Sequence, residues 1–164
     1  MENLLGSIYV EKNINQSQTP IVVKISPDIS DNQVNLISEI MLKYKVNAII
    51  ISNTTENNRG NLQNILKHQK GGLSGKPLEE KSNQLIAKFF NLLKGKIEII
   101  GVGGVDSGKS AYEKFLAGAN YVQLYTGMVF QGPNIVGKIK RELKEILKSD
   151  GVTNFKEIIG KKHN

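Results

Sequence analysis

The sequence predicts an α/β protein with a parallel sheet, and three observations lead to that prediction. Short runs rich in β-branched residues alternate with helical patterns, strand before helix, four times along the chain. Turn residues bound each of these runs. The 164 residues are 39% hydrophobic, which is enough for one domain with a core. Repeated strand–helix units give parallel strands that are joined by right-handed helical crossovers.

The expected elements follow the chain in order. Short apolar, β-branched runs predict four buried strands, at 20–26, 47–52, 97–101 and 121–125. Apolar residues that recur every three to four positions predict four helices, at 30–44, 79–93, 107–117 and 134–148. Residues 3–13 are expected to form one more helix, the tail of a unit whose strand is missing from this chain.

Two architectures contain such a sheet, an open doubly wound fold and a TIM barrel, and periodicity does not separate them. Chain length gives one indication. A complete (β/α)₈ barrel has about 250 residues, so four units of this size make half of one. Residues 1–164 are therefore expected to form a single domain, either an open sheet or an incomplete (β/α) barrel. The incomplete barrel would have two unpaired strand edges and an apolar face.

Composition excludes several classes of partner and site. The net charge is +7, but lysines alternate with glutamates in segments such as KIKRELKEILK, which is typical of a solvated helix face. No nucleic-acid partner is therefore expected. The chain has no cysteine, which excludes disulfides and thiolate zinc sites and favours an intracellular location. His68 and His163 lie far apart in sequence, so no metal site is expected.

The segment 103–110, GGVDSGKS, matches the G-x-x-x-x-G-K-[ST] pattern of a P-loop between a strand and a helix. In a P-loop NTPase, Lys109 would reach the outer phosphates and Ser110 would bind magnesium. Such an enzyme also needs a strand-end aspartate, and the nearest acid, Asp28, lies in a loop after Pro27. The alternatives are a TIM-barrel phosphate site made by two glycine-containing loops, or a turn without a ligand.

Polar residues interrupt or follow the predicted strands. Lys24 lies within an apolar run, where a buried charge is costly unless it is paired or functional. The alternative is an edge strand whose ammonium group reaches water. Ser52, Asn53, Thr54 and Thr55 follow the second strand, either as a simple turn or as a hydrogen-bonding surface. A flat heteroaromatic ligand with imide and carboxylate groups would suit them.

Several segments together resemble class 2, quinone-reducing dihydroorotate dehydrogenase. They are VKISPD, ISNTT, GGLSGKPL, IIGVGGVDSG, FLAGANYVQLYTGMVFQGP and GVTNFKEIIG, in the order of that family between residues 20 and 160. The NTT tripeptide and the length of the loop after it favour class 2. The resemblance implies the last four βα units of a TIM barrel and a part in FMN-dependent oxidation of dihydroorotate to orotate, with quinone as acceptor, in pyrimidine biosynthesis.

The resemblance also implies roles for individual residues. Lys24 would contact the FMN ring and stabilise its reduced anion, and Ser52, where the family usually has threonine, would keep a hydroxyl group against FMN. Asn53 and Thr54 would hydrogen-bond the orotate ring. The backbone at four more positions would hold the flavin, chiefly its phosphate end: Gly75, Gly104, Tyr125 and Thr126. Lys109 and Ser110 would be ordinary first-turn residues of a helix.

One departure from the family concerns the chemistry. The family's catalytic base is a serine in an Asn-x-Ser-Ser-Pro-Asn segment upstream of the lysine strand, and this sequence has no such segment. No catalytic residue is therefore expected in this chain. The resemblance implies that the base and the helices for quinone and peripheral attachment to the cytoplasmic membrane belong to a missing N-terminal half. The expected protein is a soluble fragment, inactive alone, with a complementing half as a candidate partner; a non-catalytic remnant is the alternative.

Overall fold

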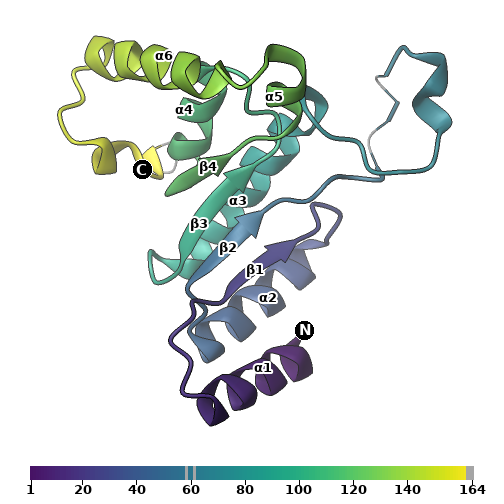
Figure 1. Ribbon diagram of the computed structural model, residues 1–164, viewed down its shortest axis with the longest axis vertical. Coiled ribbons are helices and arrows are strands. Elements are labelled where there is room, and N and C mark those ends of the chain that lie inside the picture. Colours follow the sequence, from purple (N-terminus) through teal and green to yellow (C-terminus); the bar gives the residue numbers. More distant parts are fainter. Residues whose placement is uncertain (58, 61, 162–164) are drawn as a thin grey trace.

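The structure is a computed structural model that describes residues 1–57, 59–60 and 62–161. Figure 1 shows a sheet whose strands run side by side and are backed by helices. The strands are β1 (Val22–Ile25), β2 (Ala48–Ile51), β3 (Glu98–Val102) and β4 (Tyr121–Gln123). The helices are α1 (Glu2–Ile14), α2 (Asp31–Tyr44), α3 (Glu79–Leu93), α4 (Gly108–Leu116), α5 (Thr126–Gln131) and α6 (Ile135–Ser149). Short 3₁₀ turns are η1 (Ile65–His68), η2 (Lys76–Leu78) and η3 (Phe155–Ile158).

All strand pairings within the described residues are parallel, in the order β1-β2-β3-β4. Sequence order and spatial order are therefore the same, as in consecutive βα units. The predicted α/β fold with a parallel sheet is confirmed. Strands β1 and β4 form the two edges of this sheet.

The two faces of the sheet differ in burial because side chains alternate along a strand. One face packs against α2 and α3 and carries Ile25, Ile49 and Ile99, which are 4%, 0% and 1% exposed. The other face carries Lys24 and Tyr121, which are exposed. The first strand was expected to be buried, but β1 is an edge strand of this sheet and Lys24 is exposed. Of the two interpretations of Lys24, the edge strand whose ammonium group reaches water is the one that the structure has.

A second core lies next to the edge strand β4, between α4 and α6. Phe115 packs edge-on against Phe155 of η3, with ring centroids 4.5 Å apart. The N–H of Gly160 donates to the carbonyl of Phe115 at 3.0 Å. The C-terminal segment GVTNFKEIIG is thereby fixed against α4.

The helix boundaries reflect side-chain caps. Ser30 and Gln33 form a capping box at the start of α2, and Ser107 and Ser110 form another at the start of α4. The four predicted helices that follow strands each lie within one residue of the observed ends. The sequence analysis did not anticipate α5 or the 3₁₀ turns. No helix among the described residues is long and apolar enough to cross a membrane.

Candidate functional site

A cavity of about 570 Å³ lies at the carboxyl ends of the strands, where ligand sites of parallel α/β proteins form. Its volume is within the range of ordinary small-molecule pockets. All eight residues singled out from the sequence line it: Lys24, Ser52, Asn53, Thr54, Gly75, Gly104, Tyr125 and Thr126. Loops that are far apart in sequence therefore meet at one place.

Glycine backbone forms one end of this cavity. Gly75 and Gly104 have φ angles of +78° and +76°, a conformation that L side chains rarely adopt. A Cβ on Gly75 would lie 2.9 Å from Thr126 Cγ2, and one on Gly104 would lie 2.4 Å from Glu79 Cβ. A side chain at either position would strain the backbone and collide with a neighbour, so glycine backbone lines the cavity here.

The loop after η1 is joined directly to the start of α5. The Thr126 hydroxyl donates to Ser74 Oγ at 2.9 Å. Tyr125 immediately precedes α5, and the first N–H groups of a helix have no acceptor within that helix. Glycine backbone and the first N–H groups of a helix suit a phosphate monoester at this end of the cavity.

The opposite wall is polar and comes from the end of β2. Ser52 is 2% exposed; its N–H donates to Val102 O at 3.2 Å and its hydroxyl donates to Asn53 O at 3.1 Å. The Asn53 N–H donates to Ile25 O at 2.9 Å, while the side chains of Asn53 and Thr54 are exposed at the cavity. An amide and a hydroxyl group there could bind the carbonyl and N–H groups of a heterocyclic ring.

Asp28 anchors this wall, a role that the sequence analysis missed. Its Oδ1 accepts from the Thr55 hydroxyl at 2.5 Å and from Lys81 Nζ, and its Oδ2 accepts from the Glu56 N–H at 2.8 Å. Burial raises the pKa of Asp28, but the hydrogen bonds from Lys81, Thr55 and Glu56 together outweigh it and lower the pKa to about 2. Thr55 also pairs with Leu73, through Thr55 N–Leu73 O at 3.1 Å and Leu73 N–Thr55 O at 2.7 Å.

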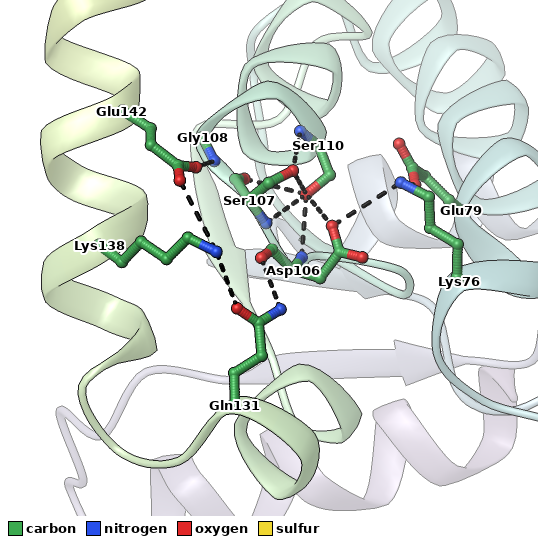
Figure 2. A network of polar contacts seen from close by, with 9 residues as sticks. All are labelled: Lys76, Glu79, Asp106, Ser107, Gly108, Ser110, Gln131, Lys138 and Glu142. Atoms are coloured by element: carbon green, nitrogen blue, oxygen red, sulfur yellow. Dashed lines mark hydrogen bonds and ion pairs between the residues drawn. The ribbon is translucent and has the colours of Figure 1, made fainter.

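A polar network closes the cavity on the side of α6, and Figure 2 shows its members. Gln131 of α5 donates to Asp106 O at 3.0 Å and accepts from Lys138 Nζ at 3.0 Å. Lys138 lies 3.8 Å from Glu142 Oε1, and Glu142 Oε2 accepts from the Gly108 N–H at 2.6 Å. The N-terminus of α4 is therefore occupied by a carboxylate of the protein itself.

Lys76 continues the network toward α3. Its Nζ lies 2.5 Å from Glu79 Oε2 and 3.7 Å from Asp106 Oδ1. Figure 2 shows the three side chains beside one another. The hydrogen bond with Glu79 raises the pKa of Lys76, and burial opposes that effect. Because both carboxylates lie against this lysine, η2, α3 and the loop after β3 are held together.

These contacts argue against the P-loop interpretation. The Ser110 side chain is 1% exposed, and its hydroxyl group accepts from the N–H groups of Asp106 and Ser107 at 2.9 and 3.0 Å. It caps α4 and is not directed at a metal. Lys109 is exposed and does not line the cavity. With Glu142 on the Gly108 N–H, no nucleotide phosphate can be received there as in a P-loop.

Metal ligands do not cluster in the part of the chain that the structure describes: no three His, Cys, Asp or Glu residues there are placed to hold an ion. His68 is exposed in η1, and His163 lies outside the described residues.

Comparisons with known proteins identify the family. The family model described as dihydroorotate dehydrogenase matches residues 2–147. This chain belongs to the dihydroorotate dehydrogenase family. It is 39% identical over 164 residues to dihydroorotate dehydrogenase (quinone) of Xanthobacter autotrophicus, covering 98% of this chain and 46% of the relative. It is 41% identical over 165 residues to the mitochondrial dihydroorotate dehydrogenase (quinone) of Mus musculus, covering 99% and 42%.

Solved structures of the dihydroorotate dehydrogenase family agree. Ligand-free DHODH from Eimeria tenella superposes with a TM-score of 0.84 at 35% identity, over 87% of this chain and 40% of that one. The complex of that enzyme with ferulenol gives 0.85 at 34% identity, over 90% and 40%. The chain thus spans less than half the length of these relatives, which is consistent with a partial barrel. The roles of the eight cavity residues remain predictions.

Proposed function

We propose that this chain supplies the phosphate-binding end and part of the ring-binding wall of an FMN site that oxidises dihydroorotate to orotate, with quinone as electron acceptor. The observation that carries the proposal is the gathering of eight predicted residues in one cavity at the strand ends. Membership of the dihydroorotate dehydrogenase family supports the same reaction. Residues 1–164 would then be one incomplete barrel domain, the last four of eight units.

Each wall of the cavity has a proposed task. Bound FMN would supply the acceptor for the hydride that leaves dihydroorotate. Gly75, Gly104 and the start of α5 would hold the phosphate. The flavin ring would then lie beside Ser52 and Lys24. The Lys24 ammonium group would place a positive charge where negative charge develops during reduction. Asn53 and Thr54 would orient the substrate ring by hydrogen bonds.

The proposed reaction also needs a base to take a proton from dihydroorotate, and we assign that base to a separate N-terminal half. A positioned general base contributes about 10²- to 10⁴-fold to a rate. The lack of that base and of the facing wall makes this chain inactive alone under the proposal, and FMN bound by the chain alone would leave its ring in water. Quinone access and attachment to a membrane surface would also belong to that half.

The test is a dihydroorotate-dependent dye-reduction assay with FMN present. The chain is assayed alone and after mixing with a separately expressed N-terminal half of a relative such as the Xanthobacter enzyme. Activity is expected only in the mixture, and Lys109→Ala, which changes an exposed residue outside the cavity, should leave it unchanged. Full activity of the chain alone, or a mixture that binds FMN but never oxidises dihydroorotate, would refute the proposal.

A further inference from the structure

Lys114 is a lysine in the interior of the helix layer. It lies in α4, is 0% exposed, and is among the largest fully buried side chains of the described residues. A Cβ on Gly101 would lie 2.9 Å from Lys114 Cδ, so the lysine stem packs directly under β3. The cost of burying an ammonium group makes such a position rare unless the charge has a use.

The hydrogen bonds of Lys114 lead to the cavity. Its Nζ donates to Asn83 Oδ1 at 2.9 Å and to Ser82 Oγ at 3.1 Å, and both acceptors are neutral side chains of α3. The Ser82 hydroxyl in turn donates to Val102 O at 2.6 Å. Val102 lines the cavity, and its carbonyl also accepts the Ser52 N–H. One side chain therefore separates the lysine from the cavity wall.

Ser82 also lies against the glycine turn. A Cβ on Gly103 would be 3.4 Å from Ser82 Cβ, and Gly103 and Gly104 directly follow Val102. The Ser82 hydroxyl group, which also donates to Ile51 O at 3.4 Å, therefore links the ends of β2 and β3 beside the glycine turn. That hydroxyl group accepts a hydrogen bond from Lys114 Nζ.

We propose that Lys114 is a positioning residue of the anion end of the cavity, which holds the glycine turn through Ser82 and whose charge is coupled to a bound phosphate monoester. The inference rests on the proposed FMN site and extends it to a residue outside the cavity. Because coupling between two bound groups is reciprocal, a phosphate that favours the charged lysine is itself bound more tightly when the lysine is charged.

The electrostatic surroundings make this coupling measurable. Burial lowers the pKa of Lys114 to about 7; Glu79 at the start of α3 opposes that effect, and Lys76 of η2 adds to it. Gly101 of β3, which lies against the stem, does not ionise. Glu142 of α6 is hydrogen-bonded at the other end of α4, to the Gly108 N–H. A dianion at the glycine turn would add negative charge to that of Glu79 and raise the pKa of Lys114.

The first experiment uses the unaltered chain with lysine labelled with ¹³C at Cε. The Lys114 pKa is measured by NMR without ligand, with saturating FMN, with inorganic phosphate, and with riboflavin, which has no phosphate. FMN and phosphate are expected to raise the pKa by about one unit, which corresponds to a tenfold coupling. Riboflavin should leave it unchanged. An unchanged pKa with bound FMN, or an equal rise with riboflavin, would overturn the inference.

The second experiment measures FMN affinity between about pH 7 and 9, where a phosphate with a second pKa near 6 stays dianionic. For a one-unit coupling, affinity should fall about fivefold across this range. Lys114→Met should bind FMN more weakly than the unaltered chain at pH 7, and its affinity should not change with pH. Lys109→Met, on the exposed side of α4, should show the same fall in affinity as the unaltered chain. Ser82→Ala should weaken binding at all pH values while keeping the fall.

The outcomes separate this inference from the proposed site. No binding of FMN or phosphate by the unaltered chain would remove the FMN assignment and the inference together. FMN binding with the same affinity and pH profile in Lys114→Met would remove only the inference. If Lys114→Met does not fold, as judged by circular dichroism, the NMR titration of the unaltered chain decides.

Discussion

Replacing Gly104 with alanine tests whether the glycine turn is the tightly constrained end of the cavity. Gly104 combines a φ angle of +76° with backbone in the way of any side chain: a Cβ would lie 2.4 Å from Glu79 Cβ and 2.8 Å from Glu79 Cα. The left-handed conformation costs alanine about 1–2 kcal/mol. Forcing a methyl group into a packed position adds about 1–3 kcal/mol. We expect Gly104→Ala to destabilise the fold by roughly 2–5 kcal/mol.

Gly151→Ala is a matched control. Gly151 also has a positive φ angle, +66°, but nothing lies within 4 Å of its Cβ position. The control therefore carries the backbone strain without the collision, and about 1–2 kcal/mol is expected. The difference between the two variants isolates the close approach of the turn to α3.

Urea unfolding followed by circular dichroism measures both variants against the unaltered chain, with equal m-values as the check that the curves are comparable. FMN affinity measured in parallel should fall only in Gly104→Ala, because Gly151 does not line the cavity. Equal destabilisation by the two substitutions would refute the reasoning, since it would mean that the Glu79 backbone moves away at no cost.

Three further predictions follow from named contacts. Because the Asp28 pKa falls to about 2, the charged carboxylate stabilises the fold above the ordinary pKa near 3.8, and this contribution, about 2 kcal/mol, is lost as pH falls toward 2. Urea unfolding from pH 5 to 2 should show that loss, and Asp28→Asn should be less stable at pH 5 and lack this part of the pH slope. Tyr112 donates to Asp150 Oδ2, and that bond, with burial, raises the pKa of Tyr112 to about 12. Ultraviolet titration should show a tyrosine that ionises near pH 12, and Asp150→Asn should lower that pKa; no change would contradict the contact. In a reconstituted enzyme, Lys24→Ala should slow single-turnover flavin reduction by about 10²-fold or more, as expected for a lost electrostatic stabiliser; an unchanged stopped-flow rate would remove Lys24 from the site.

Local pattern predicted most of the scaffold because periodicity and caps act over a few residues. Residues 79–93 were predicted as a helix and form α3 with the same ends. The cavity residues could also be anticipated, since the carboxyl ends of adjacent parallel strands meet at one edge. In contrast, the segment after β4 was expected to be a loop. The short helix α5 there depends on packing against α6, which sequence spacing does not reveal.

Charged residues were harder to place than apolar ones. Lys114 was not singled out, because a lysine in a helix with charged neighbours is ordinarily on the surface. Its burial depends on the absence of a side chain at Gly101, which lies 13 positions away in sequence. For Lys24, the apolar run around it left a buried strand and an edge strand both open. Whether a strand is an edge depends on pairing across the sheet, and a single strand's sequence does not encode that.

The two ends of the cavity differ in how far this chain alone determines them. At the glycine end, the turn is fixed by contacts within the chain, from Glu79 against Gly104 and from Ser74 to Thr126. At the ring end, Lys24 and Asn53 are exposed at the cavity. Under the proposed function, the chain alone should therefore recognise the phosphate better than the ring. FMN should bind it measurably more tightly than riboflavin, and addition of a complementing half should strengthen both, because it adds the wall that excludes water from the ring.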